Sequence, residues 1–327
     1  MYVGSGILLT IIVVWITWYA HDVYSKALQR TSIPVREYSQ SNNLTNPLLY
    51  TDDLSLASPN LDSLKKSIAS IVKQNIDHKS ADSVSVYFRD LINSEWTGVN
   101  EQGVYKPSSM YKILVMMNYL SGADQNPSLL QKKLLYTAKT DQGQYYKPEH
   151  VLSNGNHSVQ ELINSMIIYS DNDAANALVA NDPNGYVNLF TILKLPLPKD
   201  SASPDFISPK SYSVILRTLY NGTYLTHFLS ESALGLLTST KFDGGIVSGI
   251  PKGITVAHKF GEYTNIARDQ SVVWKELHDC GIVYYPNHPF LLCIMTKGQE
   301  FNQLEDVISA ISSKAYASVD ERVKSKL

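Results

Sequence analysis

The residues best suited to chemistry lie at 105–120, where Pro107 and two serines run into a long apolar, helix-forming segment. A proline and serines directly before an apolar helical segment predict that Ser108 or Ser109 lies at a helix N-terminus. Ser109 and Lys112 would then be one turn apart on the same helix face. A neutral amine can take the proton of a serine hydroxyl, and a helix N-terminus offers backbone N–H donors to an oxyanion. The spacing therefore predicts an activated serine nucleophile.

The Ser-x-x-Lys spacing is weak evidence when it is taken alone. The pairs Ser63/Lys66 and Ser70/Lys73 share it within an ordinary amphipathic helix pattern, where a solvated helix face is the simpler interpretation. Ser109 is therefore distinguished from these serines only by the motifs that follow it in the chain.

Two further motifs follow in the chain. Ser170-Asp171-Asn172 comes after an apolar helical segment and before another helix start, which predicts a loop between two helices. Taken alone, it is explained equally well as a plain helix N-cap. Lys259 and Gly261 end a predicted strand and form the only Lys-x-Gly of the chain, where a surface strand end is the simpler interpretation. The three motifs together, in this order and in these contexts, form a much more specific pattern.

Helical spacing and strand alternation predict the elements that must position these residues. Their order is helix, strands, a helical block, strands and helix. This order implies an α/β fold of the α+β kind, with an antiparallel sheet, two terminal helices packed on it and an all-helical lobe inserted between its strands. The predicted elements include helices at 61–76 and 304–311 and strands at 83–88, 253–258, 271–274, 281–285 and 290–295.

The first 20 residues carry no charged side chain, and their length is close to the roughly 20 residues that cross a bilayer. We therefore predict a membrane anchor at 1–21. A cleaved signal peptide is the competing interpretation, although the segment has no basic n-region. Lys26, Arg30 and Arg36 follow the span and no basic residue precedes it, which by the positive-inside tendency favours a cytoplasmic domain.

The remainder of the chain divides by composition. Residues 22–59 are rich in Ser, Thr, Asn and Asp and are predicted to be a linker. Residues 60–327 are predicted to form the folded domain. We expect its sheet lobe at about 60–105 and 225–327 and its helical lobe at about 106–224.

Composition excludes several classes of function. The 327 residues are 44% hydrophobic with a net charge of −2, which gives a sizeable core and no electrostatic footprint for nucleic acid. The eight histidines and two cysteines show no zinc spacing, and neither a phosphate loop nor a Gly-x-Ser-x-Gly elbow is present. We therefore expect no metal and no cofactor. Cys280 and Cys293 flank a predicted hairpin, where we expect two buried free thiols, with a cross-strand disulfide as the alternative.

The ordered Ser-x-x-Lys, Ser-Asp-Asn and Lys-x-Gly motifs resemble those of the penicillin-interacting serine hydrolases, and most closely the class A β-lactamase-related branch. The resemblance covers roughly residue 60 to the C-terminus. Residues 159–162, 174–178 and 257–262 add local matches. The resemblance implies the fold described above and an acyl-serine site.

The resemblance also implies a role for each motif residue. Ser109 is the nucleophile that attacks a lactam or acyl-peptide carbonyl, and Lys112 is its general base, with a pKa lowered by burial and by the second lysine. Ser170 relays a proton to the leaving nitrogen between Lys112 and Lys259. Asn172 binds the substrate's side-chain amide and steadies Lys112, and Lys259 supplies positive potential for the substrate carboxylate.

The strand motif carries further implied roles and two departures from the family. The backbone N–H groups of Ser109 and Glu262 form the oxyanion hole, and Gly261 lets the strand edge approach the substrate closely. Phe260 stands where the family usually has Thr or Ser, and we expect it to change the packing, because strand alternation points it away from the substrate. Glu262 replaces a small residue and is expected to narrow the cleft.

The larger departure concerns release of the acyl group. Class A β-lactamases carry a glutamate after Ser-Asp-Asn that activates the deacylating water. Residues 194–208 contain no glutamate. Asp200 and Asp205 are the nearest substitutes, and we interpret both as exposed loop aspartates.

These observations predict a monomeric, membrane-tethered serine hydrolase with an extracytoplasmic domain that is acylated at Ser109 by a β-lactam or a similar amide. One alternative is a D-alanyl-D-alanine carboxypeptidase or related penicillin-binding wall enzyme acting on a peptidoglycan peptide, which the missing glutamate favours. Another is a non-catalytic cell-wall or ligand-binding module on the same fold.

Overall fold

The computed structural model describes residues 57–139, 144–198 and 205–325. The predicted anchor at 1–21 and nearly all of the predicted linker at 22–59 lie outside the described residues. Within the described ranges, no helix combines the length and the apolar character that crossing a bilayer requires.

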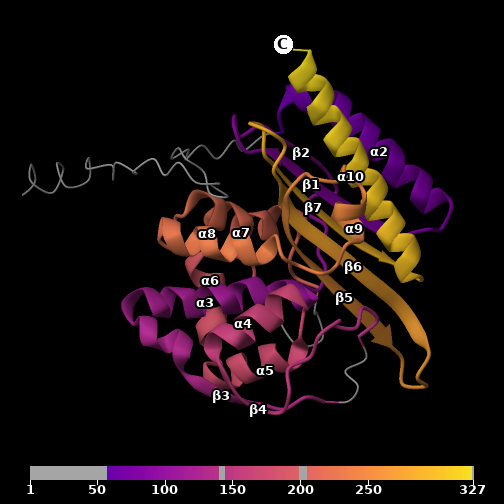
Figure 1. Ribbon diagram of the computed structural model, residues 1–327. Helices are drawn as coiled ribbons and strands as arrows, with labels where there is room; N and C mark the ends of the chain where they lie inside the picture. The colour runs from indigo at the N-terminus through magenta and orange to yellow at the C-terminus, as the bar shows by residue number, and fades with distance from the viewer. Residues whose placement is uncertain (1–56, 140–143, 199–204, 326–327) are drawn as a thin grey trace, which may run out of the picture. The chain divides into compact units, whose positions relative to one another are not determined.

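A five-stranded antiparallel sheet forms the centre of the described domain (Figure 1). Its strands are β1 (Ser83–Asp90), β2 (Trp96–Val99), β5 (Val256–Ile266), β6 (Val272–Val283) and β7 (Phe290–Gly298). Their spatial order is β2-β1-β7-β6-β5, so the first two strands join a sheet whose other members come from the end of the chain. The strand that carries Lys259 is therefore an edge strand.

The central strands divide their side chains between two cores. In β7, Leu291, Cys293 and Met295 belong to one core, and Leu292 and Ile294 belong to the other. This alternation is the period of two that a pleated strand imposes. Because both faces of β7 are buried, its sequence reads as a continuous apolar run rather than as an alternating one.

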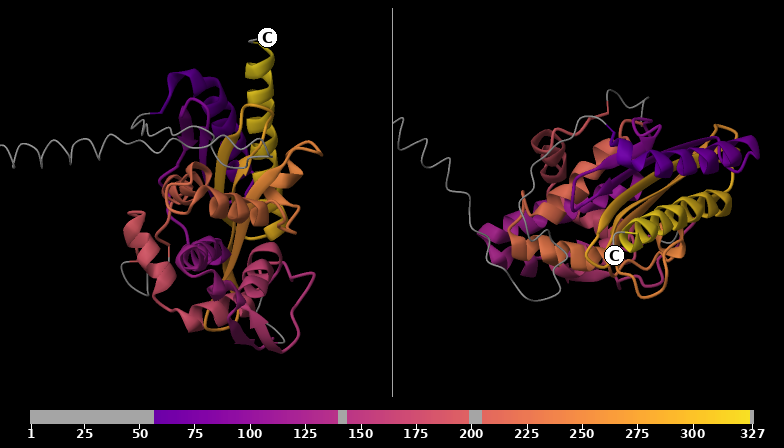
Figure 2. Two further views of the ribbon diagram at one scale, coloured as in Figure 1. Left: turned by 60° about the vertical axis from the view of Figure 1, so that its left-hand side comes forward. Right: turned by 90° about the horizontal axis from the view of Figure 1, so that it is seen from above.

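One face of the sheet is covered by helices from both ends of the domain. They are α2 (Asp62–Asp77), which follows the short 3₁₀ turn η1 (Pro59–Leu61), together with α9 (Gly245–Ser248) and α10 (Phe301–Lys324). Figures 1 and 2 show α2 and α10 side by side, and their residues are in contact. Ile68, Leu304 and Ile308 are fully buried beneath them. The two predicted terminal helices are thus confirmed.

The other face carries the inserted lobe, as predicted. Its helices are η2 (Ser108–Tyr111), α3 (Lys112–Gln125), η3 (Pro127–Gln131), α4 (Val159–Ile168), α5 (Asn172–Asn181), α6 (Gly185–Ile192), α7 (Pro209–Asn221) and α8 (His227–Leu237). The lobe also contains a two-stranded antiparallel sheet of β3 (Lys133–Tyr136) and β4 (Gly155–Ser158), which the sequence reading did not anticipate. Gly155 and the three polar residues that follow it in β4 gave no strand pattern to detect.

One strand was divided in two by the sequence analysis. Strands were predicted at 271–274 and 281–285, but both belong to the single strand β6, which spans twelve residues. Between them lie Glu276, His278 and Asp279, all fully buried. Because buried charged side chains are rare, these polar residues did not indicate a strand in the sequence.

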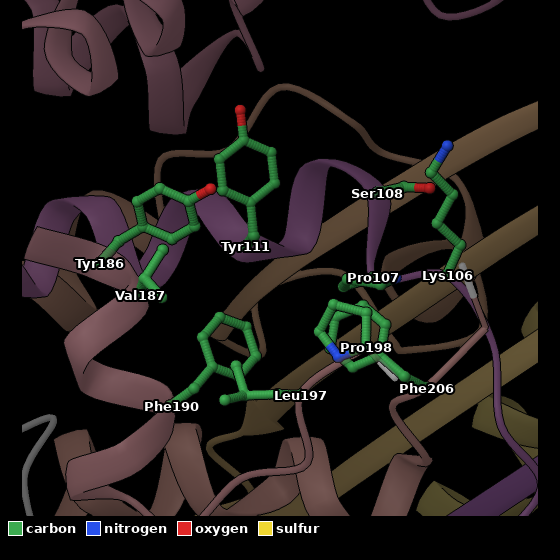
Figure 3. A pocket seen from close by; sticks show the side chains of 10 residues that line it. All are labelled: Lys106, Pro107, Ser108, Tyr111, Tyr186, Val187, Phe190, Leu197, Pro198 and Phe206. Atoms are coloured by element: carbon green, nitrogen blue, oxygen red, sulfur yellow. The ribbon is translucent and has the colours of Figure 1, made fainter. Parts of the chain in front are cut away.

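A cavity of about 650 Å³ lies in the helical lobe beside η2 (Figure 3). Aromatic rings of Tyr111, Tyr186 and Phe190 line it, and its size falls within the range of small-ligand sites. Ser108 lies at its edge, whereas Ser109 is not among the described residues that line it. The cavity therefore adjoins the turn that holds the predicted nucleophile without containing it.

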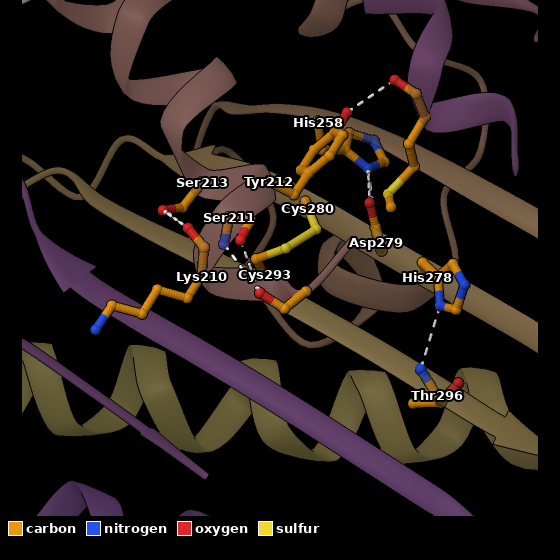
Figure 4. Close-up of a disulfide and its surroundings, with 12 residues drawn as sticks. Lys210, Ser211, Tyr212, Ser213, His258, His278, Asp279, Cys280, Cys293 and Thr296 are labelled. Carbon is orange, nitrogen blue, oxygen red and sulfur yellow. Dashed lines mark hydrogen bonds and ion pairs between the residues drawn. A yellow bond between two sulfur atoms is a disulfide. The ribbon is translucent and has the colours of Figure 1, made fainter. Parts of the chain in front are cut away.

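The expectation of two free thiols was wrong. Cys280 of β6 and Cys293 of β7 form a disulfide, drawn in Figure 4. The two residues face each other directly in the register of the antiparallel pair, with their Cα atoms 4.0 Å apart. Both are fully buried, and Figure 4 shows Tyr212 of α7 beside them. The sequence placed the two cysteines on either side of a predicted hairpin but did not fix the register that brings them opposite each other.

Replacing both cysteines (Cys280→Ala with Cys293→Ala) should lower the free energy of unfolding by about 2–4 kcal/mol, because the disulfide closes a short loop in the unfolded chain. Urea unfolding followed by circular dichroism measures this difference. As a control, an alkylating reagent should label the denatured wild-type chain only after reduction. Two labels on the unreduced, denatured chain would show that the bridge does not form.

Candidate active site

The predicted nucleophile lies in a tight 3₁₀ turn rather than within the first α-helical turn. In this turn the backbone N–H of Lys112 donates to the carbonyl of Ser109. Ser108 has a φ of 47°, in the left-handed region that residues other than glycine rarely adopt. The carbonyl of the fully buried Met110 accepts a hydrogen bond from Tyr212 Oη at 2.9 Å. The backbone around Ser109 is therefore fixed from both sides.

Two buried lysines converge on the hydroxyl of Ser170. Lys112 Nζ donates to the backbone carbonyl of Ser170 at 2.6 Å and to its Oγ at 3.3 Å. Lys259 Nζ donates to the same Oγ at 2.9 Å. Asn172 Oδ1 accepts a further hydrogen bond from Lys112 at 2.6 Å. Four residues from three distant motifs thus share one site, and the sequence predicted all four.

Burial changes the protonation of the two amines. It holds the pKa of Lys112 well below its usual range, and the charge of Lys259 lowers it further, against the opposing effects of Asp171 and Glu262. Burial also lowers the pKa of Lys259 to about 7, although Asp279 and Glu262 oppose the change. A lysine whose pKa is lowered in this way is available near neutral pH as a proton acceptor.

A buried aspartate, not singled out from the sequence, holds Ser170 in place. Ser170 has a φ of 56°, which again is left-handed. The neighbouring Asp171 caps α5 by accepting two backbone N–H groups of its first turn. The other carboxylate oxygen accepts hydrogen bonds from Ser165 Oγ at 2.8 Å and Tyr136 Oη at 3.1 Å. The cap could be read from the sequence, but these two hydroxyl donors come from other elements and could not.

Phe260 is a packing residue, as expected from the sequence. Its ring stacks on Phe242 with centroids 4.2 Å apart and meets the edge of Tyr146 at 5.6 Å. Lys259 Nζ lies 4.3 Å from the centroid of the same ring and donates to the Phe260 carbonyl at 3.1 Å. The aromatic ring thus forms one wall of the environment of Lys259.

Gly261 brings β5 against the turn that holds Ser109. A Cβ atom at this position would lie 3.0 Å from both Met110 Cγ and the Pro107 carbonyl oxygen. Such contacts are tighter than most that a real Cβ atom makes, so the absence of a side chain lets the strand and η2 meet without a shift of either. The structure therefore shows Gly261 close to η2. The close approach of Gly261 to a substrate stays a prediction.

The side chain of Glu262 makes a contact that the sequence did not indicate. Its carboxylate accepts hydrogen bonds from the backbone N–H groups of Tyr145 at 3.0 Å and Tyr146 at 3.1 Å. Tyr145 Oη in turn donates to Asn302 and Tyr146 Oη to Glu305, both on α10. Burial raises the pKa of Glu262 above its usual value. The carboxylate therefore ties the edge strand to the segment that precedes the Ser-Asp-Asn motif.

Of the two substitutes for the missing glutamate, the structure describes Asp205, whose carboxylate is already paired. Asp205 forms an ion pair with Lys297 of β7 at 2.9 Å and is only 27% exposed, which corrects its interpretation as an exposed loop residue. Lys297 also pairs with the buried Glu276 at 2.9 Å, so Asp205 is held against the sheet. Asp200 lies outside the described residues.

The oxyanion donors are the remaining predicted feature of the site. The backbone N–H groups of Ser109 and Glu262 stay predicted donors, on facing elements that contact each other. Across the ranges that the structure describes, no cluster of His, Cys, Asp and Glu side chains could hold a metal ion. The amines of Lys112 and Lys259 and the hydroxyl of Ser170 together offer acid–base chemistry.

Comparison with solved structures identifies the same fold elsewhere. The TLA-3 extended-spectrum β-lactamase matches with a TM-score of 0.67 at 21% identity, over 79% of this chain and 98% of that one. A PBP-A mutant, solved as an acyl-enzyme complex with penicillin G, matches with a TM-score of 0.64 at 20% identity, over 80% and 97%. A β-lactamase from Xanthomonas campestris pv. campestris matches with a TM-score of 0.64 at 19% identity, over 77% and 97%. At these identities the likeness is one of fold.

Comparison with curated protein sequences found no match. A family model described as the beta-lactamase enzyme family matches residues 63–319, which is most of the chain and includes every motif described above. The chain therefore belongs to the beta-lactamase enzyme family.

Proposed function

We propose that this chain is a serine hydrolase that forms an acyl intermediate at Ser109 with a β-lactam or a similar amide. The observation that carries the proposal is the Ser170 hydroxyl, which accepts hydrogen bonds from the two buried amines of Lys112 and Lys259. This arrangement supplies a proton acceptor, Lys112, three residues after Ser109, and a proton relay, Ser170, in contact with that acceptor. Membership of the beta-lactamase enzyme family supports the same chemistry.

Acylation then proceeds by three proton transfers. Neutral Lys112 takes the proton of Ser109 Oγ as the Oγ–C bond forms and the carbonyl oxygen becomes negative. The N–H groups of Ser109 and Glu262 stabilise that oxyanion, and one such donor is typically worth about 10²–10³ in rate. As the C–N bond breaks, Ser170 gives its proton to the leaving nitrogen. The ammonium of Lys112 returns a proton to Ser170, which restores both groups.

The other site residues position these groups. Lys259 orients the Ser170 hydroxyl through its hydrogen bond at 2.9 Å. Burial is the main cause of the low pKa of Lys112, and the charge of Lys259 lowers it further. Asn172 fixes the amine of Lys112. We also assign it the binding of a substrate amide. Each of these roles depends on the two amines staying buried.

A second candidate function follows from the deacylation step. Residues 194–208 contain no glutamate, and Asp205 is paired with Lys297. We propose that the chain lacks an efficient general base for water, so that the acyl-enzyme is long-lived. That property favours a penicillin-binding wall enzyme, such as a D-alanyl-D-alanine carboxypeptidase acting on a peptidoglycan peptide, over an efficient β-lactamase.

We also propose that the domain is extracytoplasmic and tethered by residues 1–21. A buried disulfide between Cys280 and Cys293 supports this placement, because structural disulfides persist mainly in oxidising compartments. The basic residues that follow the predicted span argue for the opposite orientation. Protease protection of the domain in intact cells would decide between the two orientations.

Long incubation with excess penicillin G should add the mass of one penicillin to the wild-type chain, as measured by intact-mass spectrometry. Ser109→Ala should remove the adduct, because it removes the nucleophile. The matched control is Ser63→Ala, which alters a Ser-x-x-Lys pair on α2 and should leave the adduct unchanged. Persistence of the adduct in Ser109→Ala would contradict the proposal.

After acylation and removal of free penicillin, the adduct should persist over many turnover times of an efficient β-lactamase, because residues 194–208 carry no counterpart of the glutamate that activates water in class A β-lactamases. The decay of the adduct mass with time measures this lifetime. Rapid return to the unmodified mass, with steady hydrolysis of a chromogenic β-lactam, would instead establish an efficient β-lactamase.

The acylation rate should rise with pH on its acidic limb as Lys112 loses its proton. Lys259→Gln should move that limb to higher pH, because removing a neighbouring positive charge raises the pKa of Lys112. The matched control is Lys65→Gln on an exposed face of α2, which should leave the limb in place. An acidic limb that stays fixed or moves to lower pH in Lys259→Gln would exclude coupling between the two lysines.

A further inference from the structure

We propose that a cavity between β1, β2 and the start of α7 is a binding site for a small phosphorylated ligand. The cavity has a volume of about 440 Å³, which lies within the range of small-ligand sites. We call it the basic cavity, after the side chains of Arg89, Lys210 and Arg217 that line it. Ser109 is not among its described lining residues, so the inference does not depend on the proposed acylation.

The first observation is the sign of the charge around the basic cavity. Arg89 comes from β1, and Lys210 and Arg217 come from α7. None of the described residues that line the cavity is acidic. The whole chain carries a net charge of −2, so three cations around one cavity are a local excess. Because a cleft lined by charges of one sign concentrates the opposite ion, this excess predicts an anionic ligand.

Two acids that lie close to these cations in the chain have partners elsewhere. Asp90 directly follows Arg89 but pairs with Arg322 of α10 at 3.3 Å. Asp205 precedes α7 and pairs with Lys297 of β7 at 2.9 Å. Neither carboxylate is among the described lining residues of the basic cavity. These two acids therefore do not offset the positive charge around it.

The second observation is the type of cation. Two of the three are arginines, whose planar fork of N–H donors fits the oxygens of a phosphate in pairs. Arg89 is only 3% exposed, and its Nη1 donates to Tyr87 Oη at 3.4 Å. Both Arg89 and Arg217 have further partners in the protein. A guanidinium carries five N–H donors, which allows it to bind an oxyanion in addition to such partners.

The third cation is positioned by an aromatic ring. Lys210 Nζ lies 3.8 Å from the centroid of the Trp96 ring, which itself stacks on Tyr87 with centroids 5.5 Å apart. Figure 4 shows the Lys210 side chain extending away from the disulfide and from Tyr212. The amine is therefore held in place before a ligand arrives, which lowers the entropy cost of binding.

The first turn of α7 contributes side chains rather than backbone donors. The N–H of Lys210 donates to the carbonyl of Glu101 at 3.2 Å. The N–H groups of Ser211 and Tyr212 donate to the side chain and the carbonyl of Ser208. Ser211 Oγ accepts a hydrogen bond from Ser208 Oγ at 3.1 Å, so its own proton is available for a ligand oxygen.

The number of donors favours a phosphate over a carboxylate. A phosphate monoester has three terminal oxygens and a charge of about −1.5 to −2 near neutral pH, whereas a carboxylate has two oxygens and one charge. Three cations and the hydroxyl of Ser211 surround the basic cavity. A phosphate group uses more of these donors and balances more of their charge.

The test is isothermal titration calorimetry of the full chain with phenyl phosphate and, separately, with benzoate, which carries a carboxylate on the same ring. Phenyl phosphate should bind at least about tenfold more tightly, because of its larger charge and additional oxygen. Its binding should also weaken as the salt concentration rises. No binding of phenyl phosphate, or equal or tighter binding of benzoate, would overturn the assignment.

Two substitutions locate the ligand. Lys210→Gln and Arg217→Gln should each weaken the binding of phenyl phosphate by about tenfold or more, because each removes a charged hydrogen-bond donor. The matched control is Arg268→Gln in the exposed turn between β5 and β6, which should leave binding unchanged. Circular dichroism confirms that the variants are folded. Unchanged binding in either folded cavity variant would overturn the inference.

A further variant separates the basic cavity from the Ser109 site, whose two lysines also attract anions. Lys259→Gln should leave phenyl phosphate bound at the basic cavity with wild-type affinity, because Lys259 is not among the described lining residues. Loss of binding in Lys259→Gln, together with retention in Arg217→Gln, would place the ligand at the Ser109 site and overturn the inference.

Discussion

The structure depends on the burial of two amines around one hydroxyl. Lys112 and Lys259 are fully buried, and placing two ammonium charges side by side without water would be very costly. The cost is reduced because burial lowers the pKa of both amines and because each donates to Ser170. Every segment that meets here must therefore hold its position closely. A small opening would let water reach the amines and return the lysine pKa values toward their usual range.

The fold meets this requirement by supporting each segment from behind. The Ser109 turn is held by Tyr212, the Ser170 loop by Asp171, and the edge strand by the contact of Gly261 with η2. Asp279, whose charge acts on Lys259, is also fixed in place. It lies 2.9 Å from His258 Nδ1 and accepts a hydrogen bond from the backbone N–H of Ile246 in α9. The site thus lies where the helical lobe meets the edge of the sheet, and each lobe contributes one of the two lysines.

The sequence was most informative where chemistry is local. Ser109, Lys112 and the Ser-Asp-Asn and Lys-x-Gly motifs could be located because each has a fixed spacing and a recognisable structural context. The sheet with its terminal helices followed from the order of the patterns. These parts of the prediction needed only near neighbours in the chain.

What the sequence could not supply depends on register and on distant partners. The disulfide needed the register of β6 against β7, and the continuity of β6 was hidden by the buried polar stretch around Glu276. The contact of Glu262 with Tyr145 joins residues more than a hundred positions apart. Asp205 was assigned to solvent because its partner, Lys297, lies on a strand that the loop reaches only in the folded chain.

The central claim concerns the protonation of the two amines, and NMR titration of lysine labelled with ¹³C at Cε measures it directly. Lys112→Gln and Lys259→Gln would assign the two resonances. The structure predicts that both titrate far below the value of about 10.4 for a free lysine side chain, with Lys259 near 7. Titration of both lysines near 10 would show that the amines are solvated and would contradict the proposed role of Lys112 as the base.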